Sequence, residues 1–108
     1  MEQLKKMIPN EVCVMWDEYK NAWVWAFEST LKHEGKEDTF LVCEGIARVK
    51  VTTYDNGMWA MPTVTVEVQS VTITDISYWL DGIVEIELHR SNIIELEELI
   101  YQKAYAEI

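Results

Sequence analysis

Two stretches of alternating apolar and polar residues, joined by a segment with an Asn-Gly pair, constrain the fold more than any other feature. The alternation has a period of two in residues 40–53 and again in residues 63–73, which is typical of strands with one buried face. Asn56-Gly57 supplies the two positive φ angles that a type I′ turn requires. The sequence therefore predicts a β-hairpin.

The second strand of this hairpin changes phase once. Its apolar residues occupy even positions over 64–68 and odd positions over 71–73. A shift of one residue inside a strand indicates a β-bulge, because one extra residue then opposes the partner strand. We expect the bulge near Gln69 and Ser70.

Residues 11–31 are compatible with two structures. A β-hairpin would pair residues 11–16 with residues 22–27 across a polar turn at 17–21, and β-branched and aromatic residues favour it. A single helix would explain apolar residues that recur every three or four positions. The helix leaves Val14, Val24 and Trp25 off its apolar stripe, so we favour the hairpin.

The ends of the chain carry helical signals. Residues 1–8 are expected to form a short helical turn before Pro9. After a turn at Asp81-Gly82, residues 83–88 are expected to form a strand, and residues 93–105 a helix. Ser91 or Asn92 would cap this helix, and its buried face would contain Ile93, Leu96, Leu99, Ile100 and Ala104.

These elements predict a single α+β domain over residues 1–108. We expect an antiparallel sheet of about four to six strands with the C-terminal helix packed on one face. The 108-residue length suits one core, and 49% hydrophobic residues can bury enough surface to fold it.

Charge is the least ordinary part of the composition. The formal net charge is −10; residues 1–54 carry 9 acidic and 7 basic side chains, whereas residues 55–108 carry 10 and 2. Nucleic acids and anionic membranes require a basic surface, so neither is expected as a direct partner. No apolar stretch is long enough for a signal peptide or a membrane span, which favours the cytoplasm.

The sequence contains no catalytic motif. Cys13 and Cys43 have no Cys-x-x-Cys spacing and are expected to be buried thiols. The neighbours of His33 and His89 match no zinc or hydrolase motif. A metal site formed by both cysteines and a histidine stays open, but the spacing does not favour it. We therefore expect no enzyme, no cofactor and no metal.

Five tryptophans are many for this length, and a small sheet uses large side chains to bury area. We expect most of them in the core. Trp59 is the exception, because it follows the tight turn together with Met58 and Met61. Trp and Met at a hairpin end suit a partner surface, although packing over the end of the sheet is an equal alternative.

Acidic residues form the other candidate contact surface. On the C-terminal helix no Lys or Arg lies four residues after an acidic side chain to neutralise it. Such acids also favour solubility, but an unbalanced negative face can dock on a basic protein surface. The candidate acidic residues are Glu85, Glu87, Glu95, Glu97 and Glu98.

Three segments together resemble small uncharacterised bacteriophage and prophage proteins. They are residues 53–59 (Thr-Tyr-Asp-Asn-Gly-Met-Trp) with Pro62, residues 66–73 (Val-Glu-Val-Gln-Ser-Val-Thr-Ile), and a Glu/Leu-rich C-terminal helix. Thr63 stands where that pattern has a second proline. The resemblance, over residues 53–105, implies a mobile-element origin and a small sheet with a helix, and supplies no catalytic residue. For a phage-encoded chain, the expected compartment is the cytoplasm of the host cell.

Two functions follow as hypotheses. The first is a non-enzymatic acidic protein-interaction module, phage-encoded as the resemblance implies, that binds or inhibits a host or phage protein with a basic surface. The second is a structural or assembly protein that self-associates through a sheet edge or exposed aromatic residues; a homo-oligomer is compatible with either.

Overall fold

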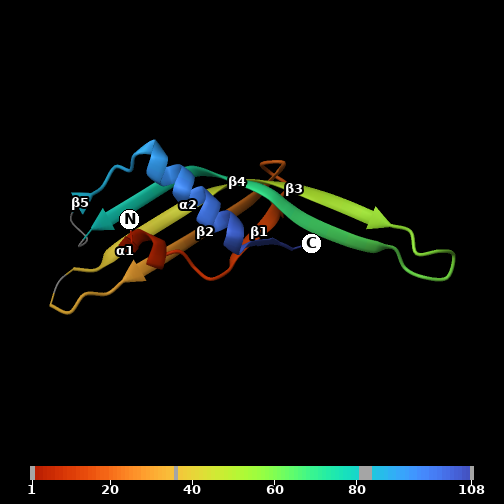
Figure 1. The fold of residues 1–108 in the computed structure, drawn as a ribbon, viewed down its shortest axis with the longest axis horizontal. Coiled ribbons are helices and arrows are strands. Elements are labelled where there is room, and N and C mark those ends of the chain that lie inside the picture. The colour runs from red at the N-terminus through yellow and green to blue at the C-terminus, as the bar shows by residue number, and fades with distance from the viewer. Residues whose placement is uncertain (1, 36, 81–83, 108) are drawn as a thin grey trace.

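Figure 1 shows a computed structural model of the chain, which describes residues 2–35, 37–80 and 84–107. Its elements are α1 (Glu2–Lys6), β1 (Val12–Asp17), β2 (Ala22–Leu31), β3 (Thr39–Tyr54), β4 (Thr63–Leu80), β5 (Val84–Glu85), α2 (Arg90–Lys103) and β6 (Ala104–Ala106). The short N-terminal helix before Pro9 is confirmed.

The six strands form one sheet in the order β5-β4-β3-β2-β1-β6. An α+β fold is therefore confirmed, but the expectation of a wholly antiparallel sheet is wrong. Four neighbouring pairs are antiparallel, while β6 runs parallel to β1. These two strands are distant in sequence, so no hairpin turn fixes their relative direction. The sheet curls until β6 lies near β4, which makes it nearly barrel-shaped.

The N-terminal hairpin is confirmed and the helical alternative for residues 11–31 is excluded. β1 and β2 pair with Met15 opposite Val24 and Trp16 opposite Trp23. Asn21 closes the turn with a φ of 53°, a left-handed conformation that asparagine tolerates well. β2 continues to Leu31, four residues beyond the expected end, because it pairs with β3 along this length.

The long β3–β4 hairpin is confirmed, but its turn differs from the prediction. Residues 55–62 separate the strands, and Gly57 has a positive φ of 101° whereas Asn56 does not. The Asn56 amide instead donates hydrogen bonds to the carbonyl of Met61, at 3.0 Å, and to the hydroxyl of Thr63. Asn56 therefore shapes a wider loop rather than a two-residue turn.

β4 contains the expected bulge and a second one. Arg48 pairs with Ser70 and Val49 with Val68, which leaves Gln69 as the extra residue. Glu44 pairs with Asp75 and Gly45 with Ile73, so the next extra residue is Thr74. Bulges increase strand bending and twist, and these two lie where the sheet curls over its core.

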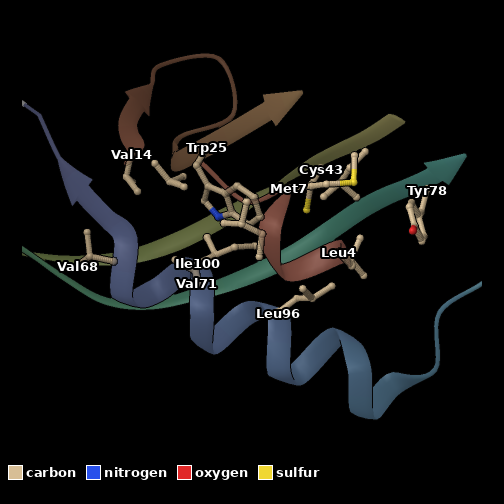
Figure 2. Packing of buried hydrophobic residues seen from close by; sticks show 13 residues of the cluster. Leu4, Met7, Val14, Trp25, Cys43, Val68, Val71, Tyr78, Leu96 and Ile100 are labelled. Carbon is tan, nitrogen blue, oxygen red and sulfur yellow. The ribbon is translucent and has the colours of Figure 1, made fainter. Parts of the chain in front are cut away.

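The core lies between the curled sheet, α1 and α2 (Figure 2). It combines residues from both helices and from the segment after α1 with one face of the strands: Leu4, Met7, Ile8, Val12, Val14, Trp25, Leu41, Cys43, Val68, Val71, Tyr78, Leu96 and Ile100. Residues directly opposite in neighbouring antiparallel strands share a face, so this side is called the helix-side face and the other the open face.

The C-terminal helix differs from its prediction at both ends. α2 begins at Arg90 and ends at Lys103, and its N-cap His89 makes no side-chain capping bond. Ser91 and Asn92 thus lie inside the helix rather than capping it. Leu96 and Ile100 are fully buried as expected, Ile93 and Leu99 partly so, while Ala104 belongs to β6.

The strand expected over residues 83–88 is shorter than predicted. β5 comprises Val84–Glu85, and the backbone of Ile86 adds one bond to Tyr78, with an N–O distance of 2.8 Å. Beyond these residues the chain turns away to start α2. The expected turn at Asp81-Gly82 falls outside the described residues.

Candidate interaction surface

The outer part of the β3–β4 hairpin projects from the body of the protein. β2 accompanies β3 up to Ala47, after which β3 pairs with β4 alone. We call residues 50–66 the arm; it extends to the right in Figure 1, and it stretches the molecule to 64 × 27 × 26 Å. Isolated two-stranded ribbons are marginally stable in water. Contact with another surface would therefore stabilise an arm of this length.

The tip of the arm presents three large apolar side chains to solvent. Met58, Trp59 and Met61 are 88%, 96% and 87% exposed. The loop that holds them has internal hydrogen bonds, since the Asp55 carboxylate accepts one from the Gly57 amide at 2.9 Å and Asn56 bonds across it. The expectation that Trp59 is exposed at a hairpin end is confirmed.

Along the arm, the helix-side face is uncharged and mostly apolar. Val51 pairs with Val66, and Thr53 with Val64. Val51 is 52% exposed and Val64 44%. We call the valines of this face, which continue inward to buried Val68, the valine stripe. The stripe continues the apolar face of the core past the end of α2.

A second aromatic feature lies at the inner end of the arm. The rings of Trp16 and Trp23 meet edge to face, with centroids 5.7 Å apart. Together with Met15 and Glu107 they line a surface cavity of about 430 Å³, which we call the Trp16 cavity. Trp16 is 47% exposed, so this aromatic pair is accessible from solvent.

The tryptophans are less buried than expected. Of the five, Trp25 is buried and Trp23 is half-buried, whereas Trp16, Trp59 and Trp79 are exposed. The prediction that most tryptophans belong to the core is therefore wrong. The open face of the sheet and the ends of its hairpins are exposed to solvent, and the remaining tryptophan rings lie at these positions.

The acidic residues of α2 have different surroundings. Glu95 forms an ion pair with Lys5 of α1. The Glu97 carboxylate is half-buried and accepts a hydrogen bond from the backbone N–H of Ile73, at 2.8 Å. Glu98 is exposed. Within the described residues, two of these three carboxylates therefore interact with groups of the protein itself.

Glu85 and Glu87 lie at the other end of the molecule from the arm. Both are exposed beside a surface hollow of about 540 Å³ that is also lined by Ile76, Ile86, Leu88 and Ile93. Figure 1 shows β5 at one end and the arm tip at the other. The apolar candidates therefore lie at the arm tip, whereas the acidic candidates are divided between the β5 end and α2. No single compact surface contains them all.

The two cysteines lie on opposite faces of the sheet. Cys43 is buried on the helix-side face, opposite Phe27, and burial, followed by the charges of Asp75, Glu44 and Glu97, raises its pKa from 9.0 to about 12. Cys13 is half-buried, and its thiol donates to Glu107, with an Sγ–O distance of 3.6 Å.

The two histidines have different surroundings. His33 shares a hydrogen bond of 2.9 Å with the hydroxyl of buried Thr39 and is half-buried. His89 is exposed at the start of α2. Over the described ranges, no group of three His, Cys, Asp or Glu side chains has an arrangement that could hold a metal ion.

Comparisons with protein families, curated proteins and solved structures find no match to this chain. The resemblance to small phage proteins accordingly stays a prediction. None of the helices in the described part of the chain is long and apolar enough to cross a membrane.

Sequence reasoning missed the valine stripe and the Trp16 cavity. The alternation did place Val51 and Val64 on the apolar side of a strand, but it did not show that the neighbouring strands and α2 end before reaching them. Comparing the expected lengths of the two hairpins could have revealed this overhang, since residues 40–53 exceed residues 22–27 by eight positions.

Proposed function

We propose that the protein is a non-enzymatic protein-interaction module and that the arm is its contact element. The observation that carries this proposal is the nearly complete exposure of Met58, Trp59 and Met61 at the end of a projecting hairpin. Buried aromatic anchors contribute most of the binding energy in many interfaces, and Met adapts to irregular partner surfaces. The arm tip has this composition.

The chemistry of the arm describes the site on the partner. Residues 50–66 contain one basic and one acidic side chain, Lys50 and Asp55, and therefore no net charge. The anchor site on the partner is accordingly an apolar pocket. Acidic residues elsewhere, including exposed Glu85, Glu87 and Glu98, would steer the protein toward a basic surface around that pocket.

Photo-crosslinking tests the proposal directly. A photoreactive phenylalanine analogue replaces Trp59 in the producing cell, and the control places it at Tyr19, which is fully exposed in the β1–β2 turn. We expect a discrete crosslinked protein species from position 59 and none from position 19. Equal, diffuse labelling from both positions, or none from either, contradicts the proposal.

Self-association is the second candidate function, and the valine stripe favours it. An apolar strip that continues directly from a folded core suits a contact between copies of one chain, because homodimer interfaces resemble such cores. The same crosslinking experiment separates the candidates by mass, since self-association gives a product of twice the mass of the chain.

A further inference from the structure

The arm is the part of this acidic chain through which two copies can meet with the least repulsion. The chain carries a net charge of −10, whereas residues 50–66 carry none. Lys50 pairs with Glu67 on the open face, so neither charge interrupts the valine stripe. The projecting arms also keep the acidic bodies of the two copies apart. At 0.1 M salt, charges separated by more than about 10 Å are largely screened from each other.

The valine stripe can pack against a copy of itself. A two-fold axis requires a surface that is complementary to itself, and a strip of similar branched side chains meets this condition when two arms lie antiparallel. Sheets that pack face to face bury such apolar side chains between them. Val51, Val64 and Val66 of each arm would then lie against the valine stripe of the other.

One position of the axis matches the tip of each arm to the inner end of the other. Thr52 lies midway between Ala47 and Gly57, five residues from each. An axis at Thr52 therefore brings the tip of one arm to the Ala47 row of the other copy. In this row Ala47 pairs with Trp23, which in turn pairs with Trp16, and both tryptophans line the Trp16 cavity.

We infer that the partner of the arm is a second copy of this chain, bound as an antiparallel arm-to-arm dimer with each tip in the other's Trp16 cavity. This inference rests on the proposed function, because it names the protein that the arm contacts. It keeps the apolar pocket of that proposal but not the basic surface around it, since a second copy is itself acidic. Trp59 would meet the edge-to-face pair of Trp16 and Trp23, and the Met58 and Met61 thioethers would lie against aromatic rings. Both kinds of contact are favourable beyond the area they bury.

The exposed apolar area of the arm and the Trp16 cavity is a large part of what a stable dimer buries. Three nearly fully exposed tip side chains, the half-exposed valines and the exposed part of Trp16 offer apolar surface on the order of several hundred Å² per copy, and flanking arm residues add to it. Standard interfaces bury roughly 800 Å² per partner. Glu107 is the charged residue among those lining the cavity, and its carboxylate already accepts the hydrogen bond from Cys13.

Sedimentation equilibrium across the micromolar range tests the dimer. We expect wild type to dimerise, and Trp59→Ala and Val51→Lys each to weaken the dimer at least tenfold. The control, Tyr19→Ala, removes an exposed aromatic ring away from the arm and should dimerise like wild type. A wild-type monomer at all concentrations, or a dimer that both arm variants leave unchanged, overturns the inference.

Disulfide trapping tests the antiparallel arrangement. In a Cys13→Ser background, chains with Trp59→Cys are mixed with chains with Trp16→Cys and oxidised; buried Cys43 stays in both. We expect a crosslinked heterodimer and little Trp59→Cys homodimer, because antiparallel arms keep the two tips apart. A predominant Trp59→Cys homodimer means tip-to-tip contact and contradicts the antiparallel dimer.

Failure of this inference and failure of the proposed function give different results. If the chain is monomeric while position 59 crosslinks to a protein of another mass, the second copy is excluded and the interaction module stands. If the chain is monomeric and position 59 crosslinks to nothing, both fail. A crosslink of twice the chain mass together with a Trp59-dependent dimer supports both.

Discussion

The indole of Trp25 occupies the space that a side chain at Gly45 would need. The two residues face each other across β2 and β3, and a Cβ at position 45 would lie 2.6 Å from Cζ2 of Trp25 and would also overlap the carbonyl oxygen of Thr72. The Trp25 Nε1–H donates to the Ile46 carbonyl at 2.9 Å. The ring is thus fixed over the middle of the sheet, just before the arm begins.

Gly45→Ala should therefore destabilise the protein. Backbone on one side and a held ring on the other cannot both move away from the added methyl group, and overpacking of this kind costs about 1–3 kcal/mol or more. Urea unfolding followed by circular dichroism measures the free energy of unfolding. Wild-type stability in Gly45→Ala would show that the strands separate more easily here than the contacts imply.

Glu97 is expected to stabilise the fold rather than to bind a partner. Its carboxylate accepts the Ile73 N–H next to the Thr74 bulge, on the side of β4 away from β3. Hydrogen bonds to charged groups contribute about 1.5–3 kcal/mol. Glu97→Ala should lower the free energy of unfolding by about 2 kcal/mol, and Glu97→Gln, which keeps an acceptor oxygen, by less.

The neighbouring acids supply the controls for this measurement. Exposed Glu98→Gln should change stability little, and so should Glu95→Gln, because its ion pair with Lys5 is partly exposed and such pairs contribute about 0–1 kcal/mol. Similar losses in all three Gln variants would indicate a general helix effect instead of a specific bond to Ile73.

Local sequence patterns predicted those parts of the fold that local contacts determine. The phase change at Gln69 locates a bulge because register and burial are linked residue by residue in a strand. Aromatic and β-branched residues in β1 and β2 similarly outweighed the helical spacing of residues 11–31. By contrast, the parallel β1–β6 pair joins residues about ninety positions apart, and no local signal reports such a contact.

The candidate site was predictable in composition but not in arrangement. Trp59 and its methionines follow a turn signal, so their exposure could be inferred. The surroundings of Glu97 could not be inferred, because only the tertiary packing of α2 beside β4 brings its carboxylate to the Ile73 N–H. The Asn56-Gly57 pair led to a wrong prediction of a two-residue turn. The Asn56 side chain instead forms hydrogen bonds with Met61 and Thr63, which stabilise a longer loop.

Cys43 should make the protein less stable in alkali. Its pKa is raised from 9.0 to about 12 by burial first and by nearby carboxylates second. The unfolded chain therefore loses this proton at lower pH than the native protein, so the contribution to stability is complete below pH 9 and is lost as the pH rises toward 12. Unfolding free energies between these limits should fall less steeply in Cys43→Ala than in wild type. Parallel pH profiles would contradict this assignment.

The same burial should distinguish the two thiols chemically. A disulfide reagent at neutral pH needs an accessible thiolate, so it should label half-buried Cys13 and leave Cys43 unreacted until the protein unfolds. Mass spectrometry after labelling in the native and the denatured state gives the count and the position of the modified residues. Rapid native labelling of Cys43 would mean that the sheet opens readily around it.

Substitution of the arm tip should separate binding from stability. Trp59 is 96% exposed, whereas Trp25 is 3% exposed. Loss of a buried tryptophan costs about 3–5 kcal/mol, so Trp25→Ala should unfold much more easily than wild type, while Trp59→Ala should stay within about 0.5 kcal/mol. Urea unfolding at protein concentrations low enough to keep wild type monomeric makes the comparison. Normal folding of Trp59→Ala combined with a weakened dimer in sedimentation equilibrium would place the role of Trp59 in recognition. A stability loss near that of Trp25→Ala would place it in the fold.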